Sequence, residues 1–201
     1  PALSRVLHRR LCRFVARRSA AAIVKAKWMR EVVGEGAHVI PNGVDLERFC
    51  PVDAPERAAL RRALKLDERT RYVLFGADPG RPNKRFRLAR AAVADAAARL
   101  PVPLELIAVH GRPQSDVAHF MQAADALILT STQEGSPNVL KEALASGMRV
   151  VSVDVGDAPE RLKGVSGCRI VSSHTPEALG AALTDVLTAD EPVEGPHAVA
   201  D

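Results

Sequence analysis

Short apolar runs alternate with amphipathic segments along most of this chain, and the alternation predicts its secondary structure. Runs rich in Val, Ile and Leu are typical of buried strands, whereas apolar residues three and four positions apart are typical of helices. Strands are predicted at residues 20–25, 38–41, 72–76, 104–109, 125–129, 149–153 and 168–171. Helices are predicted at residues 2–18, 27–33, 55–64, 84–100, 115–123, 138–145, 159–162 and 176–187.

The strand and helix predictions after residue 42 alternate strictly, which indicates an α/β protein. Strands joined by helices form parallel βαβ units, whose sheet is covered on both faces. The Pro-Asn-Gly turn signal at residues 41–45 places a domain boundary near Asn42. We therefore expect residues 1–41 to form one unit and residues 42–187 the main domain. The acidic, Pro-containing residues 188–201 are predicted to be a disordered tail.

Four loops follow the predicted strands of the main domain and contain most of the candidate chemistry. Ligands of open parallel sheets bind beyond the carboxyl ends of the strands. The loops at that end are residues 76–84, 110–113, 130–137 and 154–157. We therefore expect a ligand site where these loops meet.

The chain from residue 134 to residue 147 combines two carboxylates with the start of a predicted helix. Ser136 suits the N-cap of this helix, because its hydroxyl can accept a bond from a first-turn amide. Gly147 suits the position after the helix, where the backbone often adopts a left-handed conformation. The first-turn amides and the helix dipole favour an anion. Glu134 precedes this anion site and Glu142 follows it. The arrangement fits a ligand with phosphate in its middle and hydroxyls at each end, although Glu142 also fits a plain surface position.

Two cations in the loop at residues 76–84 are candidates for the same ligand. Arg81 and Lys84 follow a strand and open a helix, so both side chains can reach the crevice beside the Glu134 loop. A guanidinium and an ammonium at this position would neutralise a diphosphate. A solvated helix start is the alternative, and we favour phosphate binding. His110 ends a neighbouring strand and is a further candidate for ligand contact.

Charge and cysteine content narrow the class of protein further. Residues 1–30 contain nine of the 28 Lys and Arg residues and no acid, so the basic charge belongs to the predicted helix at 2–18 and its surroundings. This helix either attracts acidic lipid head groups or presents a solvated face while its other side packs on a domain, and we favour the second. Nucleic acid is not expected as a partner, because no aromatic residues interleave with the arginines. Three widely spaced cysteines favour free thiols over a zinc site.

Three segments together resemble the C-terminal half of the retaining GT-B glycosyltransferases of family 4. Residues 39–45, VIPNGVD, are similar to the family's interdomain segment. Residues 76–84 are similar to its diphosphate-binding loop, and residues 134–142 fit its E-x7-E motif. The resemblance extends over about residues 20–187 and implies a Rossmann-like doubly wound sheet, preceded by a remnant of the N-terminal domain at residues 1–41.

The resemblance also implies a role for each matching residue. Glu134 would contact the donor sugar, Glu142 the ribose hydroxyls, and Arg81 and Lys84 the diphosphate. Other donor-binding candidates are Gly135, Ser136, Asn138, Val139 and His110. Glu134, Lys84 and Arg81 are the expected catalytic residues. Neither a metal nor another cofactor is expected.

As a member of this family the protein would be a hexosyltransferase that uses a nucleotide-diphosphate sugar and a carbohydrate or lipid-linked acceptor. We expect a role in bacterial surface polysaccharide or glycoconjugate synthesis, in the cytoplasm or at the inner face of the plasma membrane. We also expect the 201 residues to bind nucleotide diphosphate weakly and to transfer no sugar alone. The alternatives are a GT-B epimerase or phosphorylase and a non-catalytic nucleotide-binding or interaction module.

Overall fold

Five parallel strands form the central sheet of this protein, in a computed structural model that describes residues 2–190 and 193. The strand order is β4-β3-β5-β6-β7, and every neighbouring pair is parallel. The strands are β3 (Arg71–Phe75), β4 (Leu104–Ala108), β5 (Ala126–Leu129), β6 (Arg149–Val153) and β7 (Cys168–Val171). The predicted α/β class with a parallel sheet is therefore confirmed.

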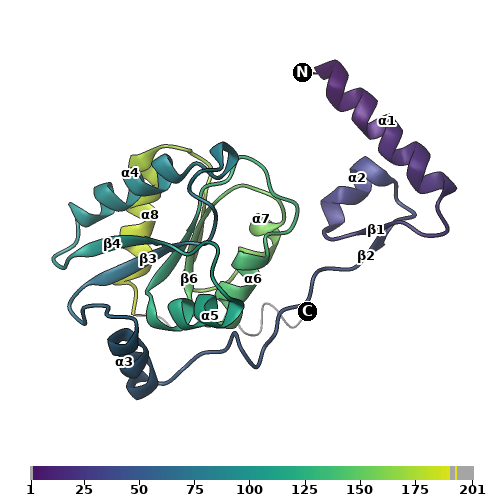
Figure 1. The fold of residues 1–201 in the computed structure, drawn as a ribbon. Helices are drawn as coiled ribbons and strands as arrows, with labels where there is room; N and C mark the ends of the chain where they lie inside the picture. The colour runs from purple at the N-terminus through teal and green to yellow at the C-terminus, as the bar shows by residue number, and fades with distance from the viewer. Residues whose placement is uncertain (1, 191–192, 194–201) are drawn as a thin grey trace.

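Helices cover both faces of the sheet, as a doubly wound arrangement requires (Figure 1). One face packs against α4 (Phe86–Ala97) and α8 (Pro176–Thr188). The other packs against α5 (Gln114–Ala123), α6 (Asn138–Ala145) and α7 (Ala158–Leu162), and α3 (Ala54–Ala63) lies beside α5. The helices 138–145, 159–162 and 176–187 were thus predicted to within a residue or so.

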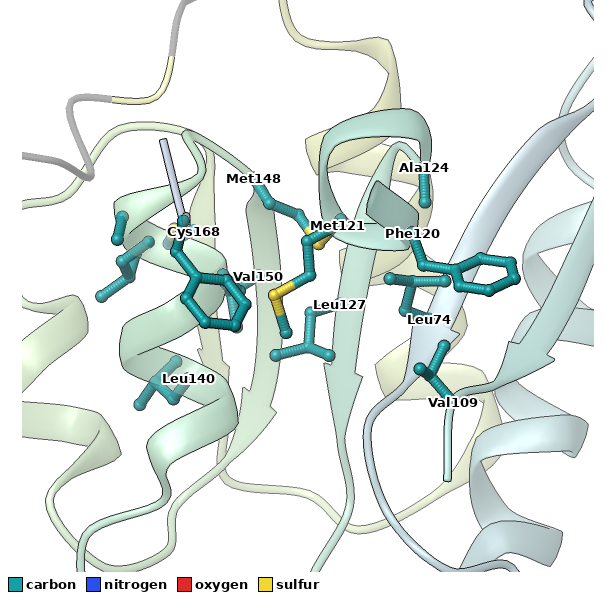
Figure 2. Close-up of a cluster of buried hydrophobic side chains, with 14 of the residues drawn as sticks. Leu74, Val109, Phe120, Met121, Ala124, Leu127, Leu140, Met148, Val150 and Cys168 are labelled. Carbon is teal, nitrogen blue, oxygen red and sulfur yellow. The ribbon is translucent and has the colours of Figure 1, made fainter. Parts of the chain in front are cut away.

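A hydrophobic core lies on each face of the sheet. Successive strand residues belong alternately to the two cores, because side chains of a strand point alternately to opposite faces. Leu74, Leu127 and Val150 belong to the core under α5 and α6, where they meet Phe120 and Leu140 (Figure 2). Their chain neighbours lie in the core under α4 and α8; these are Val73, Ile128 and Val151. Both sets are buried, which explains why the strands read as continuous apolar runs.

The helix predicted at residues 84–100 begins later than expected. Residues Pro82–Lys84 form a short 3-10 helix, η2, and Arg85 follows it in the left-handed region with φ of 53°. The α-helix therefore starts at Phe86. The sequence pattern missed this break because Arg85 is not a residue type that favours left-handed backbone.

The elements predicted before residue 42 are present, but the two strands are shorter than expected. The strands β1 (Ile23–Val24) and β2 (His38–Val39) form a two-stranded parallel pair, joined by η1 (Lys27–Met29) and α2 (Arg30–Val33). The helix α1 (Ala2–Arg18) was predicted correctly and contacts α2. Its apolar face stays exposed, with more than half of each of these side chains open to solvent: Leu7, Leu11, Phe14 and Val15. No helix among the described residues has the length and apolar character that crossing a bilayer requires.

A buried ion-pair network holds α3 to the amino end of the sheet. Asp125 accepts hydrogen bonds from Arg61 at 2.7 Å, from Arg57 at 2.9 Å and from the Tyr72 backbone amide at 2.7 Å. The Arg61 and Asp125 side chains are only 10% and 11% exposed. Removing one partner from such a pair leaves a buried charge without compensation.

We therefore expect Asp125→Ala to lower the free energy of unfolding by about 3–5 kcal/mol, measured by urea denaturation followed by circular dichroism. The matched control is Glu68→Ala, which removes an exposed carboxylate that faces Arg62 at 3.7 Å. Its expected cost is about 0.5 kcal/mol or less. Equal effects of the two substitutions would contradict the structural role of the network.

Candidate functional site

The order of the strands places a crevice between the loops that follow β3 and β5. From β3 the chain first passes to β4, which pairs with one edge of β3. It then returns to β5, which pairs with the opposite edge of β3. The two loops diverge at such a switch point, which is where open α/β sheets bind ligands. A Cβ atom added at Gly76 would lie 2.2 Å from Val139 Cγ2, so only glycine lets α6 approach the end of β3 this closely.

Hydrogen bonds join the two loops across the crevice. Thr130 Oγ1 donates to the backbone carbonyl of Lys84 at 2.8 Å, and the Thr132 amide donates to that of Asn83 at 2.8 Å. Arg85 Nε donates to the Thr130 carbonyl. The two threonine bonds use backbone carbonyls of the β3–α4 loop, so none of these bonds occupies the Lys84 side chain.

Arg85 is the residue of this site that the sequence did not single out. Its guanidinium also approaches the Ser131 carbonyl at 3.4 Å and His174 Nδ1 at 3.0 Å. Burial lowers the pKa of Arg85 from its usual value. Because its donors go to the β5–α6 loop and to His174, Arg85 acts here as a structural bridge.

Lys84 and Glu134 form an ion pair between the loops that follow β3 and β5. Lys84 Nζ lies 2.5 Å from Glu134 Oε1, and the two side chains are only 19% and 14% exposed. The structure thus brings together two residues that are 50 positions apart and that the sequence nominated separately. The pair places a cation and a carboxylate where a ligand entering the crevice would meet both.

Two segments fix the loop that contains Glu134 and Gly135. Gly156 has φ of 60°, and a Cβ there would lie 2.9 Å from the Gly135 carbonyl oxygen. Trp28 Nε1 donates to the same oxygen at 3.1 Å. Met29 Cε lies 2.6 Å from the position of a Cβ at Gly135. Small residues at 135 and 156 therefore let the β6–α7 loop and the chain around Trp28 pack onto the Glu134 loop.

Ser136 is not the N-cap of α6, contrary to the sequence prediction. Its hydroxyl donates to Asp157 Oδ2 at 2.8 Å, and the same oxygen accepts a bond from Arg161 Nε at 2.7 Å. The N-cap is Pro137, which has no side-chain acceptor for the first-turn amides. The buried Asp157 carboxylate competes successfully for the Ser136 hydroxyl. The amino end of α6 therefore has no side-chain cap, which keeps its positive end suited to an anion.

Glu142 lies half-buried on α6, one turn beyond this amino end. Burial raises the pKa of its carboxyl, and the charge of Lys141 opposes this rise. Within residues 2–190 the carboxylate forms no hydrogen bond or ion pair. A partly buried carboxylate without partners is costly, and ligand hydroxyls would supply the missing donors.

Three other predicted site residues lie nearer the surface. Arg81 is exposed and lines a hollow of about 550 Å³ together with Arg85 and Phe86. His110 is exposed, with Nε2 3.8 Å from Asp78 Oδ2. Asn138 is also exposed, and its Oδ1 accepts a bond at 3.0 Å from Asn42 in the interdomain segment.

Comparison with solved structures assigns this fold to the C-terminal Rossmann-like domain of GT-B glycosyltransferases. The structure of Anabaena Alr3699/HepE in complex with UDP matches with a TM-score of 0.75 at 20% identity, over 96% of this chain and 61% of that one. The C-terminal domain of the glycosyl transferase group 1 protein LpcC from Francisella tularensis matches with a TM-score of 0.61 at 16% identity, over 79% and 97%.

The sequence places the chain in a family. Residues 57–189 match the profile of the glycosyl transferases group 1, and the chain belongs to this family. The D-inositol 3-phosphate glycosyltransferase of Mycolicibacterium gilvum is 32% identical over 186 residues, which are 80% of this chain and 41% of that protein. The putative teichuronic acid biosynthesis glycosyltransferase TuaC of Bacillus subtilis is 28% identical over 168 residues, covering 77% and 42%. The chain thus spans about two fifths of the length of these relatives.

The raised pKa of Glu142 implies that the stability of the folded protein depends on the charge of this carboxyl. The folded protein holds the Glu142 proton more tightly than the unfolded chain, so ionisation destabilises the fold as the pH rises through the folded pKa. Glu142→Gln removes this penalty. Thermal unfolding should therefore show a higher Tm for the variant at pH 7.5 and a much smaller difference near pH 4.

The control for this experiment is Glu105→Gln, which changes an exposed carboxylate on β4. Its Tm should differ little from that of the parent at either pH. A Glu142→Gln variant that is less stable than the parent at pH 7.5 would show that the ionised carboxylate has partners that stabilise the fold.

Proposed function

We propose that this chain is the donor-binding half of a retaining glycosyltransferase, which transfers a hexose from a nucleotide-diphosphate sugar to an acceptor. The Lys84–Glu134 pair carries the proposal, because it lies at the switch point of the sheet beside a helix start that has no side-chain cap. This arrangement offers positive charge for a diphosphate and a carboxylate for sugar hydroxyls at the same place.

The diphosphate would bind between the amino end of α6 and the β3–α4 loop. Amides of Asn138 and Val139 supply donors, while Lys84 and the exposed Arg81 supply charge that also stabilises the diphosphate as it leaves. The diphosphate competes with Glu134 for the Lys84 ammonium. Donor binding therefore releases a Glu134 oxygen to accept hydrogen bonds from the sugar, so that charge neutralisation and sugar recognition are coupled.

Glu142 would recognise the ribose. Its half-buried carboxylate has no partner among the described residues, and the two ribose hydroxyls are donors of the kind it lacks. Satisfying a partly desolvated carboxylate with two hydroxyl donors is favourable because the cost of its burial is already present in the free protein.

The known relatives support a nucleotide-sugar donor and a role in glycoconjugate synthesis. HepE has been solved with UDP, with UDP and glucose, and with UDP-glucose. The names of the curated relatives refer to D-inositol 3-phosphate and to teichuronic acid biosynthesis. We propose that this protein similarly uses a carbohydrate or lipid-linked acceptor in bacterial surface polysaccharide or glycoconjugate synthesis, at the cytoplasmic side of the membrane.

The proposed roles of Lys84 and Glu142 predict that each residue contributes to nucleotide binding. Isothermal titration of the chain with UDP, GDP and ADP should detect at least one of the nucleotides. Lys84→Ala and Glu142→Ala should each weaken that binding by about tenfold or more, since each removes charge-assisted hydrogen bonds to the ligand. Arg69→Ala, which removes an exposed cation before β3, should leave the affinity unchanged.

Circular dichroism of each variant shows whether its fold is intact. Equal nucleotide affinity in the parent and in both site variants would place the nucleotide elsewhere. Failure of all three nucleotides to bind would favour an interaction module over a donor site.

The charges of the site also predict that nucleotide binding is independent of divalent metal. Two cations and a helix start already face the diphosphate, so adding EDTA should leave the measured affinity within about twofold. A loss of tenfold that Mg²⁺ restores would contradict this arrangement.

A further inference from the structure

A second cavity lies between the chain before residue 45 and helices α6 and α7. It adjoins the loop at residues 130–137, which contains Glu134 and is called the donor loop. Its volume is about 500 Å³, within the range of small-molecule sites. Residues 25–27, which follow β1, and residues 39 and 41–44 of the interdomain segment form one wall, and Lys141 with residues at and after α7 forms the other. We refer to it as the linker cavity.

Basic side chains outnumber acidic ones around the linker cavity. The lining contains five cations and two carboxylates, namely Lys25, Lys27, Lys141, Arg161 and Lys163 with Asp157 and Glu160. Glu160 pairs with Lys27 at 2.6 Å and Asp157 Oδ2 pairs with Arg161 at 2.7 Å, whereas the other oxygen of Asp157, Oδ1, is buried without a hydrogen-bond partner among the described residues. The wall of the cavity therefore has an excess of positive charge.

Two of these lysines have no partner within the described part of the chain. Lys25 and Lys163 are exposed at the cavity and form no hydrogen bond or ion pair among residues 2–190. Asp157, in contrast, is only 4% exposed. The charge that is open to a ligand in the cavity is thus mainly that of ammonium groups.

Lys141 is a buried cation in the lining of the linker cavity, close to other basic side chains. Lys141 is 1% exposed, and its Nζ donates to the Asn42 carbonyl oxygen at 2.8 Å. Burial is the largest cause of the lowered pKa of Lys141; the charges of Arg161 and Lys25 lower it further, and those of Asp157 and Glu142 oppose the shift. These cations repel one another, so an anion in the cavity would relieve a repulsion that is present in the free protein.

We propose that the linker cavity binds an oxyanion, a phosphate or carboxylate group on the acceptor, with Lys25 and Lys163 as its contacts. This assignment to the acceptor rests on the proposed function. The cavity adjoins the donor loop, since Asp157 lines it and holds Ser136 at 2.8 Å, two residues after Glu134. An acceptor held there would lie beside the loop that would contact the donor sugar.

The test uses the full chain and compares glucose 6-phosphate, glucuronate and neutral glucose by isothermal titration at low salt. The phosphate or the carboxylate sugar should bind and glucose should not, and added NaCl should weaken the binding. Lys25→Gln/Lys163→Gln should weaken it about tenfold or more. Arg69→Gln/Arg9→Gln, which removes two cations outside the cavity lining, should leave it unchanged.

A crossed experiment separates this cavity from the donor site. Arg81→Gln should keep the binding of the sugar anion and weaken that of the nucleotide, whereas Lys25→Gln/Lys163→Gln should do the reverse. Loss of sugar-anion binding in Arg81→Gln alone would place the anion in the diphosphate site and overturn the proposal, as would binding of neither anion. Normal sugar-anion binding without any nucleotide binding would refute the proposed function and leave the anion site standing.

Discussion

The site depends on one close approach, in which the start of α6 lies against the end of β3. Gly76 leaves no side chain between Val139 and the strand, so the loops after β3 and β5 come within hydrogen-bonding distance of each other. The threonine bonds then hold the backbone at Lys84, and the Lys84 side chain reaches Glu134. A larger residue at position 76 would separate the loops and break the ion pair together with the bonds that support it.

Stability and the proposed chemistry lie at opposite ends of the sheet. At the amino end, the Asp125 carboxylate is saturated by two arginines and a backbone amide. At the carboxyl end, Glu142 is half-buried without a hydrogen-bond or ion-pair partner among residues 2–190, and the amino end of α6 has no side-chain cap there. Unsatisfied polar groups of this kind reduce stability in the free protein and are retained where a ligand completes them. This asymmetry supports a ligand site at the carboxyl end independently of any relative.

Local sequence patterns predicted the sheet well and the site only in part. The strands 149–153 and 168–171 have the predicted bounds, because each is rich in Val, Ile or Cys; all of β6 after Arg149 is buried, while Arg169 of β7 is exposed. Lys84 and Glu134 were found because each lies in a loop with recognisable helix-start chemistry. The cap role of Ser136 was wrong, and Arg85 and Trp28 were missed, because their partners lie 21 to 107 residues away. Such contacts leave no trace in local periodicity.

Chemical-shift mapping of the nucleotide complex by NMR tests the central claim most directly. Backbone amides of the 76–85 and 130–139 loops and of α6, with the indole N–H of Trp28, the single tryptophan of the chain, should shift as nucleotide diphosphate is added. Amides near Asp125, at the other end of the sheet, should not shift. Shifts confined to the Asp125 end or to α1, or no shifts at saturating UDP, GDP and ADP, would contradict a donor site at the Lys84–Glu134 pair.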